Sequence, residues 1–176
     1  SFVLARNFNI PSTNKYTLFH LDEKWIFKDY IYTYKSIEPE SEEFLVKFIE
    51  QLIKKTKCDV IISTGNLPNR FTHFLKKKFF NYNNNIYQYQ IFNNKVFFLD
   101  DLNFLELEKL ILSSNLLITC HGAVTHVAAS FNIRTIDIID KSEKIFFNKW
   151  TSHFDNHISI ERKPFKILTN EIIDNC

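Results

Sequence analysis

This sequence has very little glycine: two of its 176 residues, Gly65 and Gly122, where average usage would give about twelve. The glycine-rich patterns GxxxxGK[ST] and GxGxxG are both absent, which removes the physical basis for a P-loop or a dinucleotide-binding fingerprint. A GxSxG nucleophile elbow is missing too. Ligand chemistry must therefore be sought in the short segments around the two glycines.

Cysteine is also sparse. Cys58, Cys120 and Cys176 are odd in number and contain no CxxC pair, which is typical of a protein from a reducing compartment without a structural zinc site. Cys120 and His121 are adjacent in sequence only, which does not establish a catalytic pair. We expect a cytoplasmic protein with no metal ion and no cofactor.

Long apolar runs and a large charge of one sign are missing as well. No stretch approaches the roughly 20 apolar residues that cross a bilayer, and the first 25 residues lack a signal-peptide pattern. Membrane contact is expected to be peripheral at most, at the inner membrane face. The net charge is +2 and no basic block exceeds Lys76-Lys77-Lys78, so no nucleic-acid partner is expected. Since there is no methionine, we expect a lost initiator before Ser1 or a piece of a longer protein.

What the sequence does contain is an alternation of short apolar runs and amphipathic segments. Strands are predicted at 16–20, 58–63, 86–92, 95–99, 116–121, 134–139 and 157–161, and helices at 39–53, 68–79, 103–113, 124–131 and from 170 onward, with a polar loop at 81–85. This alternation predicts the α/β class, with a Rossmann-like, mostly parallel sheet covered by helices on both faces. An entry linker over 1–15 and a single domain over 16–176 are expected.

Two helix ends carry specific signals. Asn103 can accept a hydrogen bond at a helix start, with Glu106 at the third helical position, as in a capping box. Asn132 follows the helix at 124–131 and is suited to a left-handed cap.

The candidate active-site loop runs from Cys120 to His126, where an apolar strand ends in glycine and a helix begins. Such a turn presents backbone N–H groups and the positive end of the helix dipole, which attract anions. We predict a phosphate or diphosphate site with Lys24 at the same sheet edge. Its residues are Lys24, His121, Gly122, Ala123, Val124, Thr125 and His126. At the other glycine turn, Gly65 and Asn66 are candidates for contact with a nucleoside.

Structural alternatives stay open for these residues. Gly122 can serve the turn alone, His121 can hydrogen-bond a neighbouring loop, and His126 can be a capped core residue. Metal ligation by the two histidines is the least favoured interpretation, because residues five apart diverge on a regular helix and no carboxylate motif lies close in sequence. Trp25 is expected to be a packing residue.

Several stretches resemble glycosyltransferase family 9, the lipopolysaccharide heptosyltransferase family. The run from Leu116 to Ile139, which includes His126-Val127-Ala128-Ala129, is similar to the donor-binding half of these proteins, where Asp-Thr-Gly-Pro-Met-His-Leu-Ala-Ala is typical. Leu18 to Trp25 resembles their strand followed by a Lys-Trp element, and Asp101 to Leu112 is similar to their Ser-Leu-x-Glu-Leu run. The resemblance extends over about residues 16 to 165.

The resemblance implies one lobe of a GT-B fold. That lobe would bind the nucleotide-diphosphate sugar of an inverting, metal-independent glycosyltransferase, which acts on a glycan or glycolipid acceptor in bacterial cell-surface or lipopolysaccharide synthesis. Lys24 then matches the lysine that contacts donor phosphate, and His126 the histidine of the phosphate loop. The family's Asp falls on His121 and its Gly on Ala123, so the loop departs in its first side chains and keeps the backbone cradle. The catalytic base is expected in an N-terminal lobe or partner chain.

Two other hypotheses are kept. One is a stand-alone nucleotide- or phosphate-binding module without transferase activity. The other is a sugar-nucleotide epimerase or hydrolase on the same scaffold, which requires an acidic pair that the sequence does not place. Whether the chain is itself an enzyme stays open, because a transferase of this kind needs its second lobe.

Overall fold

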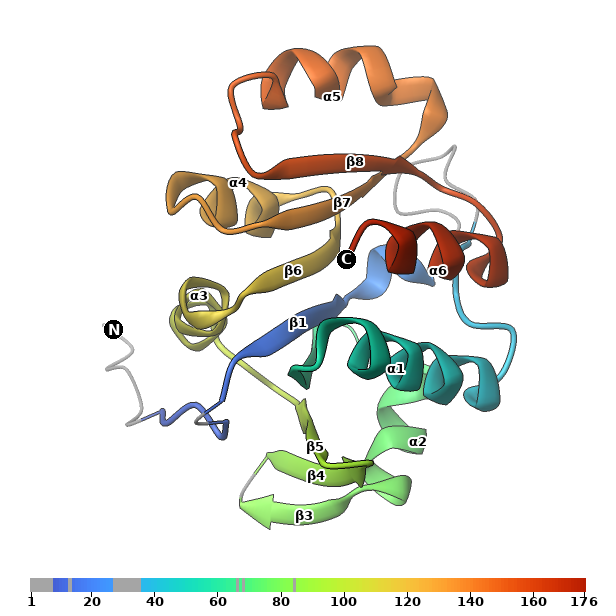
Figure 1. Ribbon diagram of the computed structural model, residues 1–176, viewed down its shortest axis with the longest axis vertical. Helices are drawn as coiled ribbons and strands as arrows, with labels where there is room; N and C mark the ends of the chain where they lie inside the picture. Colours follow the sequence, from blue (N-terminus) through green and yellow to red (C-terminus); the bar gives the residue numbers. More distant parts are fainter. Residues whose placement is uncertain (1–7, 13, 27–35, 66, 68, 84) are drawn as a thin grey trace.

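The fold is a single eight-stranded sheet with helices on both faces (Figure 1). The computed structural model describes residues 8–12, 14–26, 36–65, 67, 69–83 and 85–176. The strands are β1 (Tyr16–Leu21), β2 (Asp59–Thr64), β3 (Phe80–Asn83), β4 (Ile86–Ile91), β5 (Asn94–Leu99), β6 (Leu116–Cys120), β7 (Thr135–Ile139) and β8 (His157–Glu161). The helices are α1 (Glu42–Thr56), α2 (Arg70–Lys78), α3 (Phe104–Ser113), α4 (Ala123–Ser130), α5 (Lys144–Thr151) and α6 (Phe165–Asp174), with short 3₁₀ helices η1 (Glu23–Trp25) and η2 (Lys141–Glu143).

The strand order is β3-β4-β5-β2-β1-β6-β7-β8. Neighbouring strands pair in parallel along the part β5-β2-β1-β6-β7-β8 of this order. Strands β4 and β3 extend the sheet beyond β5, and each pairs with its neighbour in the antiparallel direction. Counted along the chain, the parallel part has the strand order of the doubly wound dinucleotide-binding folds. The predicted α/β class with a Rossmann-like, mostly parallel sheet is confirmed.

Each face of the sheet has its own core because side chains alternate along each strand. On β1, Phe19 and Leu21 join the core under α1, α2 and α6, while Tyr16 and Leu18 join the core under α3 and α4. The central strands β1, β2 and β6 are buried along their whole length. They therefore form a rigid base for the loops at their carboxyl ends.

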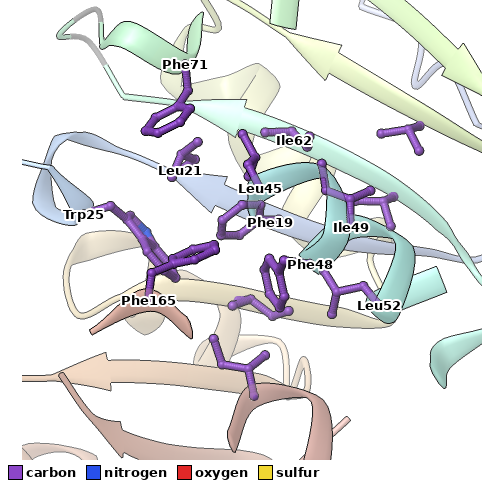
Figure 2. Packing of buried hydrophobic residues seen from close by; sticks show 14 of the residues in the cluster. Phe19, Leu21, Trp25, Leu45, Phe48, Ile49, Leu52, Ile62, Phe71 and Phe165 are labelled. Carbon is purple, nitrogen blue, oxygen red and sulfur yellow. The ribbon is translucent and has the colours of Figure 1, made fainter. Parts of the chain in front are cut away.

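The largest core cluster anchors the turn after β1. Trp25 is fully buried, with its ring edge-to-face against Phe19 at 5.1 Å and against Phe165 at 6.4 Å (Figure 2). Its indole N–H donates to the carbonyl of His20 at 3.0 Å. The expected packing role of Trp25 is confirmed, and it holds the neighbouring residue Lys24 at the sheet edge.

The predicted helix ends agree with the structure. Asn103 accepts from the N–H of Glu106 at 3.0 Å, and the Glu106 carboxylate accepts from the N–H of Asn103 at 2.9 Å, which is a complete capping box. Asn132 has φ 55°, the left-handed conformation expected of it.

Some predicted elements were wrong in extent. The segment 81–85 is not simply a polar loop, because β3 (Phe80–Asn83) pairs with β4 there. The last helix begins at Phe165 and not at Asn170, since Phe165 is buried against Trp25. Within the expected linker over 1–15, Ser12 donates to the Asp59 carboxylate at 2.9 Å, so this part of the segment is docked on the sheet.

Candidate functional site

The candidate site is a pocket of about 240 Å³ at the carboxyl ends of β1, β2 and β6, on the face covered by α3 and α4. In an open parallel sheet, ligands bind where neighbouring strands lead to connections on opposite faces. Here β1 leads to α1 on one face, and its neighbour β6 leads to α4 on the other. Of the predicted site residues, four line this pocket: Lys24, Gly65, Ala123 and Val124.

The two glycines each receive a side chain from the turn after β1. A Cβ added to Gly122 would lie 2.3 Å from the Lys24 ammonium nitrogen, and one added to Gly65 would lie 2.1 Å from Glu23 Oε2. Gly122 has φ 171°, an extended backbone that any residue adopts. Glycine at both positions therefore leaves room for the end of a neighbouring side chain, Lys24 at Gly122 and Glu23 at Gly65, and neither serves an unusual backbone angle.

The turn itself is built by Asp22, which is buried. Asp22 caps η1 by accepting from the N–H of Lys24 at 3.2 Å, and its Oδ2 lies 3.1 Å from the Lys24 ammonium nitrogen. Burial alone would lower the pKa of Lys24, but the Asp22 carboxylate outweighs it and raises that pKa. Lys24 thus stays cationic, with part of its charge offset by Asp22, and it lines the pocket.

The start of α4 supplies the second element of the site. Ser41, Asn69 and Asn103 cap α1, α2 and α3 with their side chains, whereas the N-cap residues of α4, α5 and α6 make no side-chain cap hydrogen bond. The first N–H groups of a helix have no partner within the helix, and here those of Ala123 and Val124 belong to residues that line the pocket. Backbone N–H groups and a helix dipole in this arrangement are features to which anions bind in other proteins, and the anion site predicted from the loop stays a prediction.

Beneath the loop, the fully buried Asp137 of β7 joins three side chains. Its Oδ2 lies 2.5 Å from His121 Nδ1 and 3.1 Å from His157 Nε2, and its Oδ1 accepts from the Thr125 hydroxyl at 3.1 Å. Burial alone would raise the pKa of Asp137, but the hydrogen bonds with both histidines outweigh it and hold that pKa below its usual range. An ionised carboxylate therefore fixes the loop from below.

The three polar side chains of the loop do not line the pocket. His121 pairs with Asp137, and the buried Thr125 donates to the same carboxylate and accepts from the N–H of Gly122 at 3.4 Å. His126 is largely exposed, and the partial burial of its ring together with the charge of His121 lowers its pKa. Thr125 and His121 thus position the backbone that would hold an anion.

The relation between the two histidines was predicted wrongly. Because α4 begins at Ala123, His121 precedes the helix, and the His121 and His126 rings meet edge-to-face with centroids 5.4 Å apart. Even so, within the described part of the chain no group of three or more His, Cys, Asp or Glu side chains is arranged to hold a metal ion.

Sequence reasoning missed four residues of this region. Asp22 and Glu23 belong to the turn that carries Lys24, and Asp137 shapes the loop. Arg162, just after β8, donates to the carbonyl of Lys24 and lies 3.5 Å from the Cys120 sulfur. An acidic residue inside the apolar run of β7 was a signal for Asp137, whereas nothing local marked Arg162.

Of the two candidates for contact with a nucleoside, the structure describes Gly65. Gly65 lines the pocket together with Leu102, Phe104 and the first two residues of α4. Asn66 lies outside the described residues.

Comparison with known proteins gives no information on the activity of this chain. No family model matches the sequence, and no curated protein matches it. A solved structure described as "Structure of MT0777" superposes with a TM-score of 0.48 at 14% identity, over 92% of this chain and 95% of that chain. Among the described residues, no helix combines the length and the apolar character needed to cross a bilayer.

Proposed function

We propose that this chain is the donor-binding domain of an inverting, metal-independent glycosyltransferase and holds a nucleotide-diphosphate sugar in the pocket between β1 and α4. One observation carries the proposal: the Lys24 ammonium lies against Gly122, beside the uncapped first turn of α4. A fixed cation and unpaired backbone N–H groups are complementary to a diphosphate.

In the complete transferase, the domain would stabilise the departing nucleoside diphosphate. Negative charge develops on the phosphate as the sugar is transferred, and donors already in position at that point lower the barrier. Lys24 and the N–H groups of Ala123 and Val124 are those donors. The base that deprotonates the acceptor hydroxyl would come from an N-terminal lobe or partner chain.

The same proposal includes a cytoplasmic location with peripheral contact at the inner membrane face, where a glycolipid acceptor would lie. Helix α5 exposes Ile145, Phe146 and Trp150 next to Lys149. Aromatic and aliphatic side chains flanked by lysine are typical of helices that lie on an anionic bilayer surface.

The phosphate site is tested by isothermal titration calorimetry with UDP and ADP. We expect Lys24→Ala to weaken binding about tenfold or more, because a hydrogen bond to a charged group contributes about 1.5–3 kcal/mol. Lys77→Ala, which removes an exposed lysine of α2, should leave the affinity unchanged. A smaller loss is expected for His126→Ala, since His126 does not line the pocket. Equal affinities in the Lys24 and Lys77 variants would contradict the proposal.

The hydrolase or epimerase alternative needs two available carboxylates. Asp22 is already paired with Lys24, which leaves Glu23 alone at the pocket. Incubation with nucleotide sugars, scored for free nucleotide with and without an acceptor, separates hydrolysis from transfer. A stand-alone binding module would bind the nucleotide and release none under either condition.

A further inference from the structure

Strand β3 lies at one edge of the sheet, and its outer side is open (Figure 1). Its residues Phe80, Asn81, Tyr82 and Asn83 are all exposed, and none of them is charged or proline. Among the residues that the structure describes, no strand other than β4 pairs with β3. An edge strand presents unpaired backbone N–H and C=O groups, which natural proteins often shield with charged side chains or proline. Strand β3 has neither kind of shield.

The other edge of the sheet, strand β8, is different. Glu161 of β8 forms an ion pair with Lys144 of α5, and His157 at the start of β8 is hydrogen-bonded to Asp137. Charged side chains on an edge strand oppose pairing with another chain. Of the two edges, β3 is therefore the one suited to accept a further strand.

The open edge also carries two aromatic side chains. Phe80 and Tyr82 are each 57% exposed. Phe80 lies opposite Gln88 of β4, which lies opposite Phe97 of β5, so these side chains share one face of the sheet. The Tyr82 ring meets the Phe97 ring edge-to-face, with centroids 6.3 Å apart. Because the register assigns Tyr82 no partner on β4, the edge presents an unpaired residue as well as two aromatic rings on one face.

We propose that β3 is a dimerisation edge and pairs in the antiparallel direction with β3 of a second copy of this chain. The two-fold axis passes through the pair of Asn81 residues, so that Phe80 of each copy lies opposite Tyr82 of the partner subunit. Aromatic side chains opposite each other on neighbouring strands stabilise a sheet. Shifting the register by one residue would move the aromatic side chains of one copy to the other face of the joint sheet.

The occupant is a second copy because β3 is complementary to itself. No like charges face each other in the symmetric pair, since β3 is uncharged. The nearby lysines are engaged within their own chain, Lys76 with the Asp100 carboxylate and Lys78 over the Tyr89 ring. The pairing uses the open edge of both copies, so assembly stops at two. Since no residue of β3 lines the candidate pocket, the inference is independent of the proposed function.

Sedimentation velocity at increasing protein concentration tests the dimer. We expect the wild type to shift reversibly from one chain of 21.0 kDa toward twice that mass. Tyr82→Lys should raise the dissociation constant of the dimer about tenfold or more, because it removes both aromatic pairs and places an ammonium group in each. Phe131→Lys makes a similar change at a phenylalanine that is 54% exposed after α4, and it should dimerise like the wild type.

The register is tested with an intermolecular disulfide. Residues directly opposite each other in antiparallel strands have Cα atoms about 4.5–5.5 Å apart, which is within the range that a disulfide spans. Cys58→Ser and Cys176→Ser first remove the partly exposed native thiols. In that background, Asn81→Cys should form a covalent dimer on mild oxidation, whereas Lys47→Cys, at an exposed position of α1, should not.

Three results would each overturn the proposal. A wild type that stays at 21.0 kDa at every concentration does not pair with itself, and the edge would then be left to a strand of another protein. A Tyr82→Lys variant that dimerises as tightly as the wild type would place the contact elsewhere on the molecule. Cross-linking of Asn81→Cys no greater than that of Lys47→Cys would exclude the symmetric register.

Discussion

The adjacent, oppositely charged residues Glu23 and Lys24 contact different parts of this site. Glu23 and Lys24 diverge from one turn, and each occupies the space that a side chain on a glycine would fill. Asp22 holds the turn and offsets part of the Lys24 charge. If the site binds phosphate as proposed, the affinity should depend on the α4 N–H groups as well as on the Lys24 cation.

Replacing Gly122 by alanine should separate binding from stability. The new Cβ would displace the Lys24 ammonium, which is the end of a flexible side chain, so we expect the free energy of unfolding to fall by less than about 1 kcal/mol. Affinity for inorganic pyrophosphate should fall several-fold, in the same direction as the larger loss expected for Lys24→Ala. Calorimetry and thermal melts measure both effects.

Gly65→Ala is the matched control for that experiment. It displaces Glu23 and leaves Lys24 in place, so pyrophosphate affinity should be retained. Equal losses in the two glycine variants would show that the Lys24–Gly122 contact is not what determines the affinity.

At the level of elements, helix α5 leaves most of its large apolar side chains exposed. Phe147 packs on the His121 ring with centroids 4.1 Å apart, while Ile145 is 89% exposed and Phe146 and Trp150 are 59% and 56% exposed. Figure 1 shows α5 beyond β8, at the end of the molecule away from β3. The helix contacts the site loop through Phe147 and β8 through the Lys144–Glu161 ion pair, and its side chains Ile145, Phe146 and Trp150 face outward.

We expect α5 to bind anionic lipid surfaces. Sedimentation with vesicles of phosphatidylglycerol and phosphatidylcholine should deplete the wild type from solution, and the double variant Phe146→Ser/Trp150→Ser should bind several-fold less, because buried aromatic area drives interfacial binding. Phe131→Ser removes an aromatic side chain that is 54% exposed after α4, and it should bind like the wild type. Equal sedimentation of the double variant and the wild type would contradict a bilayer contact through α5.

Over the whole molecule, polar contacts connect β1, β6, β7 and β8 around the candidate site. Asp137 of β7 holds His121, which follows β6, and His157, which begins β8. Arg162, after β8, reaches back to the carbonyl of Lys24 after β1. The site is therefore stabilised by the far half of the sheet as well as by its own loops.

This arrangement predicts an acid-sensitive fold. Because the pKa of Asp137 is lowered in the folded state, its contribution is fully present above the unfolded pKa, about 3.9, and is lost as pH falls through the lower folded value. Asp137→Asn should lower stability at pH 7 by about 3 kcal/mol, since it removes one partner of a buried charged network. It should also make stability depend less on pH below about 4. Thermal melts from pH 2 to 7 measure this.

The exposed Asp155→Asn is the control for the acid experiment. It should follow the wild-type profile throughout. If Asp137→Asn had the same acid dependence as the wild type, the buried carboxylate would not be the group responsible.

The sequence by itself determined most of the elements, because their signals are local. The capping box at Asn103, the left-handed cap at Asn132 and the strand-glycine-helix pattern at Gly122 all depend on residues a few positions apart. The same local patterns placed Lys24 and the α4 loop at one sheet edge. They mislocated the start of α6, since Phe165 belongs to the helix through its packing on Trp25.

Only the tertiary structure decided how the site is assembled. Lys24 meets Gly122, Glu23 meets Gly65 and Asp137 meets His121 because the strand order brings β1 between β2 and β6, and β7 beside β6. Such contacts join residues far apart in the chain, so no local periodicity encodes them. The physical reason is that the strand order depends on helices distant in sequence, which must bury both faces of the sheet. The pattern of residues within one segment reflects only the hydrogen bonding and polarity of that segment.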